Sequence, residues 1–372
     1  MPQSLFPRFT ATPRRTSFPR ILRPNRPCLD MRAPALFLTA LFFAAAVHPV
    51  SAQTRPDPQS EIGGLQSKFV NVDGVQARYY ELGQGEAMVM IHGGFTAGSS
   101  TANVFSRNIP GLAKHFHVYA VDRLACGMSG NPKDEKNYSS QSDVDFIYSF
   151  IQTLKLGKVH LVGHSAGGAI ALYLSVEHPE VVRTLAILAD GPEDPPHGPT
   201  KLVDMLKKCP DQHQYAGLKC RVDQLAWLPT TFDDEYWKAD RFMASQAKNR
   251  EALETVEAKS SQRNTDMAST RDQMLERIKT EGMLQMPILL VAGKNDVLDW
   301  AANAPTAELT NELALMDVIA AKNPNVQMFV FNNAGHFMYR EHPQEFNAVL
   351  TTWIVYWKNN PTEPPQGGLP NE

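Results

Sequence analysis

A serine inside a glycine-rich turn is the residue best suited to chemistry. Ser165 is the centre of Gly163-His164-Ser165-Ala166-Gly167, which follows an apolar run at 159–162 and precedes an apolar stretch. This order predicts a strand, a sharp turn and a helix. Glycines two residues to either side allow a strained turn that exposes the hydroxyl, and the helix start offers free amide groups. The pattern indicates a nucleophilic serine.

A nucleophilic serine requires a base, because its hydroxyl holds its proton at neutral pH. Histidine has the appropriate pKa range, and a carboxylate behind it stabilises the charged ring. His336 follows the predicted strand 326–331 after a short loop. His164 lies within the serine turn and is expected to pack, and His92 is expected to make a structural hydrogen bond. We therefore predict His336 as the base.

Three aspartates compete for the role of the acid that orients His336. Asp296 and Asp299 follow the predicted strand 287–291, and Asp190 follows the strand before it. Asp296 is nearer to its strand end than Asp299, which the loop is expected to carry away. We predict Asp296, with Asp190 as the second choice and Asp299 as the third.

A second glycine-rich loop, residues 92–95, follows another apolar strand. Its glycines let the backbone approach a bound group, so the amide of Gly94 is predicted to stabilise an oxyanion together with the amide of Ala166. Phe95 and Phe337 are predicted to contact the substrate. The alternative is a simple glycine turn without a catalytic role.

Short apolar strands alternate with helical patterns on both sides of one long interruption. This alternation predicts an α/β protein with a mostly parallel sheet that helices cover on both faces. One of these helices is expected at 143–156, with Ser140 and Asp143 as a capping box. Residues 191–284 contain no buried strand pattern and predict an inserted helical cap. We divide the chain into a core at 53–190 and 285–357, the cap, and a polar, disordered tail at 358–372.

The first 52 residues have the composition of a targeting segment. They carry seven arginines and one aspartate, and an uncharged apolar stretch at 33–47 precedes Val50-Ser51-Ala52. This layout predicts a signal peptide that starts at Met31, is preceded by an upstream extension, and directs the protein to the periplasm or outside the cell. A basic transit peptide and a membrane anchor are the alternatives, although 33–47 is short for a membrane span.

The charge of the chain argues against one class of partner. The net charge is −3, and nothing after residue 52 forms a basic stripe, so nucleic acid is not an expected partner.

Export permits a disulfide. Cys209 and Cys220 are close in sequence and are predicted to form one, against the alternative of free buried thiols, while Cys126 belongs to another segment.

Five short motifs together resemble the α/β-hydrolase family. They are GHSAGG at 163–168, HGG at 92–94, D-x-x-x-x-G-x-S at 122–129, G-x-x-D at 293–296 and GH at 335–336. The resemblance implies an eight-stranded sheet, a Ser165, His336 and Asp296 triad, an oxyanion hole, a helical cap, and catalysis without a cofactor or metal. Ala125 departs from the family, since many members have glycine there.

The type of reaction is less strongly indicated than the fold. Residues 102–109 are similar to hydrolases that cleave carbon-carbon bonds in ring-fission products. Those enzymes commonly have tryptophan where this chain has Phe337, and they act in the cytoplasm. We therefore predict hydrolysis of a small carboxylic ester or lactone through an acyl-enzyme. The alternatives are carbon-carbon hydrolysis of a 2-hydroxy-6-oxo-dienoate and an inactive binding protein. A serine nucleophile argues against haloalkane or epoxide chemistry.

Overall fold

The computed structural model describes residues 57–94, 98, 100–189, 201–211, 214–258, 260–299 and 309–361. Residues 1–52 separate from the rest as a unit of their own, and only residues of the second unit are described. The predicted targeting segment, Phe95, Asp190 and the predicted tail from residue 362 onward lie outside the described residues.

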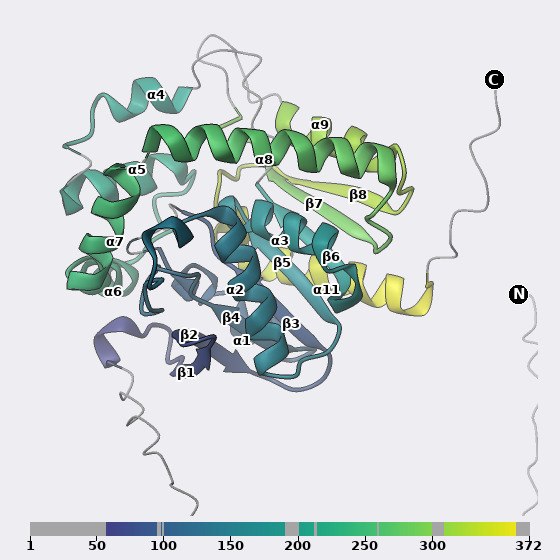
Figure 1. Ribbon diagram of the computed structural model, residues 1–372, viewed down its shortest axis with the longest axis horizontal. Coiled ribbons are helices and arrows are strands. Elements are labelled where there is room, and N and C mark those ends of the chain that lie inside the picture. The colour runs from purple at the N-terminus through teal and green to yellow at the C-terminus, as the bar shows by residue number, and fades with distance from the viewer. Residues whose placement is uncertain are drawn as a thin grey trace, which may run out of the picture. The chain divides into compact units, whose positions relative to one another are not determined.

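The described residues form an eight-stranded sheet with the order β1-β2-β4-β3-β5-β6-β7-β8 (Figure 1). β2 is antiparallel to β1 and β4, and all the other neighbours are parallel. This confirms the predicted mostly parallel sheet. The strands are β1 Ser67–Val72, β2 Val75–Leu82, β3 Ala87–Ile91, β4 His117–Val121, β5 Val159–His164, β6 Val182–Leu188, β7 Ile288–Gly293 and β8 Val326–Phe331.

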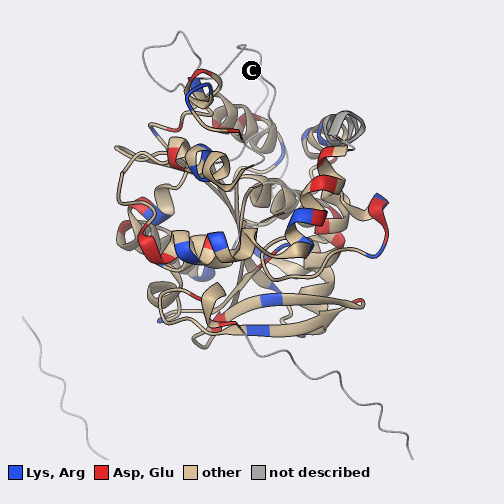
Figure 2. Ribbon diagram, turned by 90° about the vertical axis from the view of Figure 1, so that its left-hand side faces the viewer, with Lys and Arg blue, Asp and Glu red and all other residues tan. Residues whose placement is uncertain are grey.

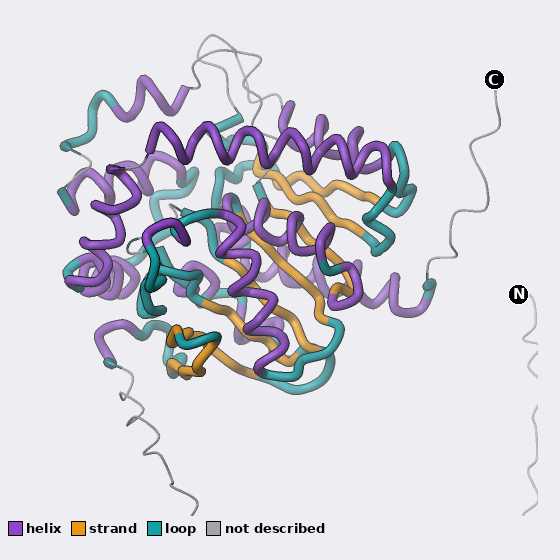
Figure 3. Tube along the Cα trace, viewed as in Figure 1, coloured by secondary structure: helices purple, strands orange, loops and turns teal. Residues whose placement is uncertain are grey.

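Helices cover both faces of the sheet, as predicted (Figure 3). One hydrophobic cluster joins the sheet to α2, α3, α9 and the second half of α8, and another joins its opposite face to α1 and α11. The core helices are α1 Ile109–Leu112, α2 Ser140–Thr153, α3 Ala166–Glu177, α9 Thr310–Ala320, α10 Met338–Glu341 and α11 Pro343–Asn359. Short 3-10 segments are η1 Pro58–Ser60, η2 Ala102–Phe105, η3 Glu135–Asn137 and η4 Pro179–Val181.

The start of α2 differs from the predicted capping box. The side chain of Ser139 caps the helix by accepting a hydrogen bond from the amide of Ser142. The carboxylate of Asp143 instead accepts from Arg123, with 2.9 Å between Nη2 and Oδ2. The capping prediction is wrong because Asp143 binds another segment, through Arg123 and the amide of Leu124, instead of the start of its own helix.

Between β6 and β7 the described residues form only helices and loops, which we call the insertion (described residues from 201 to 284). A disulfide joins Cys209 to Cys220, with Cα atoms 5.6 Å apart, which confirms the predicted pair, and Cys126 is buried and belongs to no disulfide among the described residues. The helices are α4 Lys201–Leu206, α5 Tyr215–Leu225, α6 Asp234–Ala244, α7 Ala247–Ala258 and α8 Ser260–Glu281. The sequence patterns had not indicated α4 and α5.

The charged residues of the described part are mixed in sign. Figure 2 shows lysine and arginine interspersed with aspartate and glutamate along the helices. Within the described ranges, no helix combines the length and hydrophobicity that crossing a bilayer requires.

Candidate active site

Ser165 lies at the sharp turn from β5 to α3, in a strained backbone conformation with φ 52° and ψ −130°. A Cβ on Gly163 would lie 2.2 Å from the carbonyl oxygen of Gly167, and a Cβ on Gly167 would lie 2.4 Å from that of Ile91. Only glycine fits at both places. The Ser165 side chain is partly exposed and makes no capping hydrogen bond to α3. Its hydroxyl therefore stands free at the start of the helix, where the amide of Ala166 has no partner within the helix.

His336 and Asp296 form a buried pair. Nδ1 of His336 donates to Oδ2 of Asp296 over 2.7 Å, and each residue is only 3% exposed. This bond holds the proton on Nδ1 and leaves Nε2 as the nitrogen that can accept one. The competing Asp299 accepts from Thr310 Oγ1 and from the Asn311 amide, so it serves the start of α9 instead.

His164 connects the serine turn to the histidine loop. Its Nε2 donates to the carbonyl oxygen of His336 over 2.9 Å, and its Nδ1 accepts from the Tyr339 hydroxyl over 3.2 Å. Burial, together with the nearby His336 ring, lowers the pKa of His164 well below its ordinary value. The ring is therefore neutral and structural, and it brings the turn that contains Ser165 beside the loop that contains His336.

The glycine loop after β3 lies directly against the serine. A Cβ on Gly93 would lie 2.7 Å from the Cβ of Ser165, and Gly94 has a φ of +92°, which favours glycine. The buried guanidinium of Arg123 donates to the carbonyl oxygen of Gly94 over 3.3 Å. Arg123 is held in turn by Asp143. This side chain thus holds the carbonyl group of Gly94 in place.

His92 has a structural role at the base of the same loop. Its Nε2 accepts from the Arg123 amide over 3.0 Å, and its Nδ1 donates to the carbonyl oxygen of Gly93 over 2.7 Å. Burial and then the charge of Arg123 lower the pKa of His92 to about 4. The ring is neutral and shapes the glycine loop.

Phe337 lies between the histidine loop and the insertion. It is 6% exposed, and its ring centroid lies 4.8 Å from that of Phe232 and 5.2 Å from that of His164. Its ring thus joins the histidine loop to the segment before α6. The contact with substrate that the sequence indicates for Phe337 stays a prediction.

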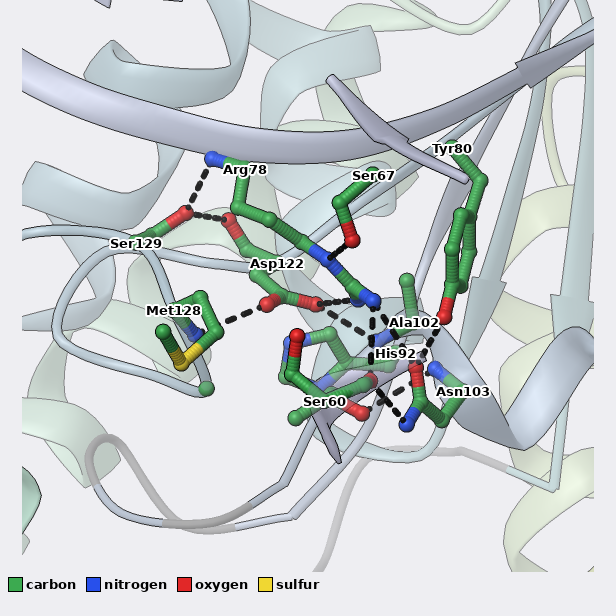
Figure 4. Close-up of polar contacts among 12 residues, drawn as sticks. Ser60, Ser67, Arg78, Tyr80, His92, Ala102, Asn103, Asp122, Met128 and Ser129 are labelled. Carbon is green, nitrogen blue, oxygen red and sulfur yellow. Dashed lines mark hydrogen bonds and ion pairs between the residues drawn. The ribbon is translucent and has the colours of Figure 1, made fainter. Parts of the chain in front are cut away.

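A buried ion pair anchors the loops beside this site (Figure 4). Arg78 Nη1 donates to Asp122 Oδ1 over 3.1 Å, and both side chains are fully buried. Asp122 also accepts from the amides of Ala102 and Met128. The aspartate of the D-x-x-x-x-G-x-S motif is therefore a structural anchor. In the same loop Ala125 has a φ of 62°, a left-handed conformation that favours glycine.

Sequence reasoning missed four buried side chains around the candidate triad. Their bonds are to residues far away in sequence, and no spacing pattern marks them. The only available signal is that three of them follow His336 within five residues. They are Arg123, Tyr339, Arg340 and Glu341.

A family model described as alpha/beta hydrolase fold matches residues 86–343. The chain belongs to this family. Curated proteins that are similar to it include two hydrolases. The 2-hydroxy-6-oxo-6-(2'-aminophenyl)hexa-2,4-dienoic acid hydrolase of Metapseudomonas resinovorans is 28% identical, over 76% of this chain and 89% of that protein. The 2-hydroxymuconate semialdehyde hydrolase of a Pseudomonas species is 26% identical, over 81% of this chain and 96% of that protein.

Solved structures of this hydrolase family share the fold. A serine hydrolase involved in carbazole degradation has a TM-score of 0.59 and 25% identity, over 78% of this chain and 99% of the other. A meta-cleavage product hydrolase from Pseudomonas fluorescens has a TM-score of 0.59 and 22% identity, over 78% of this chain and 97% of the other. The family model and the names of the relatives establish a hydrolase, but they do not bear out the carboxylic ester specificity that the sequence indicates.

Proposed function

We propose that this hydrolase cleaves the carbon-carbon bond of a 2-hydroxy-6-oxo-dienoate, with Ser165 as nucleophile, His336 as base and Asp296 as the acid that orients it. The observation that carries the proposal is the 2.7 Å bond between His336 and Asp296, beside a serine in a strained turn. The curated relatives, named for substrates of this class, support the choice of reaction.

The chemistry follows from the proton positions. His336 Nε2 takes the hydroxyl proton while Ser165 Oγ attacks the 6-oxo carbon, and the resulting oxyanion accepts from the amides of Gly94 and Ala166. The bond between C5 and C6 then breaks, and its electron pair goes to C5. That carbanion is stable enough to leave if the 2-hydroxy group is first in its keto form, because the charge spreads to the 2-oxo oxygen. The proton on His336 Nε2 then goes to the leaving dienolate, which restores the neutral ring as base for the next step. Water finally hydrolyses the acyl-serine, giving a carboxylic acid and a 2-hydroxydienoate.

Ester or lactone hydrolysis is the second candidate. Phe337 supports it, because carbon-carbon hydrolases of this type commonly have tryptophan there, and so does the export that the sequence predicts. The same nucleophile, base and oxyanion donors serve both reactions, so only the leaving group differs.

A direct comparison of the two substrate classes tests the proposal. We expect the full chain to consume a 2-hydroxy-6-oxo-dienoate, followed by its absorbance, with a higher kcat/KM than for any short-chain or medium-chain acyl ester. The reverse ranking would replace the proposed reaction with ester hydrolysis.

Two matched variants test the assignment of the acid. Asp296→Asn should lower turnover by about four orders of magnitude, because an amide holds the wrong imidazole tautomer. Asp299→Asn, three residues away and bonded to the start of α9, should keep most of the turnover. An equal loss in both variants would show that Asp296 has no special relation to His336.

A further inference from the structure

The segment that joins α5 to α6, residues 225–233, which we call the strap, lies on the loop that carries His336. The amide of His336 donates to the carbonyl oxygen of Leu225 over 3.1 Å. A Cβ on Gly335 would lie 2.8 Å from that same oxygen and 2.9 Å from the amide nitrogen of Trp227. The glycine before the histidine is therefore required for the close approach of the strap.

Glu341 binds the strap and the histidine loop with one carboxylate. Its Oε2 accepts from the amide of Gly335 over 2.7 Å. Its Oε1 accepts from the amide of Trp227 over 2.7 Å, from that of Leu228 over 3.3 Å and from Thr231 Oγ1 over 3.0 Å. Each carboxylate oxygen has about two acceptor positions, so the strap donors saturate Oε1 while Gly335 binds Oε2. Glu341 is 9% exposed, so little water competes for these charge-assisted bonds.

The neighbouring Arg340 fixes the other end of the strap. Its Nε donates to the carbonyl oxygen of Thr231 over 2.8 Å, and its Nη1 donates to Ser106 Oγ over 2.9 Å. The guanidinium carbon lies 4.8 Å from the ring centroid of Tyr236 in α6. The strap is thus attached to the core mainly through two consecutive side chains of α10.

We propose that Glu341 is a positioning residue for the hydrolysis, because it makes the strap and the loop of His336 move as one body. The inference rests on the proposed function of His336. Any displacement of the strap either breaks the bonds to Glu341 or shifts Gly335 and the histidine after it. A shift of about 1 Å in a catalytic group lowers the rate by on the order of a hundredfold, so this attachment sets how accurately His336 meets Ser165.

Glu341→Gln separates positioning from folding. Glutamine has the same shape, but the NH2 group of its side chain cannot accept a hydrogen bond. Whichever way that group points, either the amide of Gly335 or the donors of the strap lose their acceptor. We expect kcat per active site, counted by phosphonate labelling of Ser165, to fall by on the order of a hundredfold. KM should stay within a few fold of the wild-type value. The matched control is Glu345→Gln, an exposed glutamate in the first turn of α11, which should change neither constant.

Amide hydrogen exchange gives a readout that does not depend on activity. In Glu341→Gln, exchange should rise together in peptides that cover the strap and in those that cover residues 333–338, and it should stay unchanged in Glu345→Gln. A rise in one segment alone, or an unchanged kcat, would overturn the coupling. A wild-type chain without hydrolase activity would instead refute the proposed function, and the exchange result would still decide the coupling.

Thr231→Val provides a milder test if the glutamine variant does not fold. It removes the bond from the Thr231 hydroxyl to Oε1, and the bond of the same hydroxyl to the carbonyl oxygen of Leu228, and leaves the carboxylate in place. A smaller fall in kcat, again with little change in KM, is expected. A kcat equal to that of the wild type in this folded variant would contradict the proposal.

Discussion

Arg78 and Arg340 are both almost completely buried and both bind the segment η2, yet their charges are compensated in different ways. Arg78 donates to the side chain of Asn103 over 3.1 Å, and Arg340 approaches the carbonyl oxygen of the same residue at 3.4 Å. Arg78 pairs with the fully buried Asp122 at 3.1 Å. Arg340 has Asp233 at 3.8 Å, and the side chain of that aspartate is 47% exposed.

The two arginines therefore differ in how firmly their surroundings are held. Burial is the largest single influence and lowers the pKa of Arg78. The charges and hydrogen bonds of Asp122 and Tyr80 together nevertheless keep that pKa above its ordinary value. Burial leaves the pKa of Arg340 below its ordinary value. A matched charge locks the first site into the core, whereas carbonyl oxygens and aromatic rings hold the second. We therefore expect the contact between core and insertion to open at lower free energy than the surroundings of Arg78.

Removal of the charge of Asp122 should have the largest effect on stability. Asp122→Asn leaves Arg78 buried without a counter-ion, and we expect the free energy of unfolding to fall by about 3–5 kcal/mol. Denaturant unfolding of the full chain measures it. A loss below about 1 kcal/mol would mean that the neutral acceptors around Arg78 suffice, and the contrast with Arg340 would disappear.

Glu312 offers an opposite case, a buried acid. Among the described residues its Oε2 has no hydrogen-bond partner, and burial, then the charges of Asp299 and Asp296, raise its pKa to about 8. The folded state keeps this proton up to about pH 8, whereas the unfolded chain loses it near pH 4.3. Stability should therefore fall as the pH rises between these values. Glu312→Gln should remove this dependence, a difference on the order of 3 kcal/mol between pH 5 and pH 8. If the free energy of unfolding changed by the same amount between pH 5 and pH 8 in the wild type and in the variant, the prediction would be contradicted.

Arg340→Met should destabilise the protein by less than Asp122→Asn. The loss of the charge costs little at Asp233, because water reaches that carboxylate. The variant also removes the donors to Thr231 and Ser106. We expect a loss of about 2 kcal/mol in unfolding free energy. Hydrogen exchange should rise in the strap before it rises in the sheet. A loss larger than that of Asp122→Asn would reverse the comparison.

Asp233→Asn should have the smallest effect of this series. The carboxylate is partly in water, so its ion pairs with Arg340 and Arg107 are worth about 0–1 kcal/mol. Its Oδ1 also caps α6 by accepting from the Tyr236 amide, and asparagine caps a helix equally well. A loss above about 2 kcal/mol in the free energy of unfolding, measured with denaturant, would show that Arg340 does depend on a charged partner.

Local patterns were sufficient for the architecture and for the chemical groups of the candidate site. The glycines around Ser165 predict a turn because their missing side chains are a local steric requirement, and the structure has that turn. Strand ends could be located from short apolar runs, so Asp296 could be ranked above Asp299 as the partner of His336. The hairpin β1-β2 and the disulfide between Cys209 and Cys220 also depended on residues close in sequence.

Only the tertiary structure decided which polar side chains hold these groups in place. Asp143 resembled part of a helix cap, yet it binds Arg123, which in turn holds the carbonyl group of Gly94 in place. Glu341 had no motif, although it joins the strap to the histidine loop across more than one hundred residues of chain. Partners of this kind are chosen by geometry and burial after the chain has folded, because a buried charge needs whichever donors the packing brings to it. Periodicity and spacing carry no information about that choice.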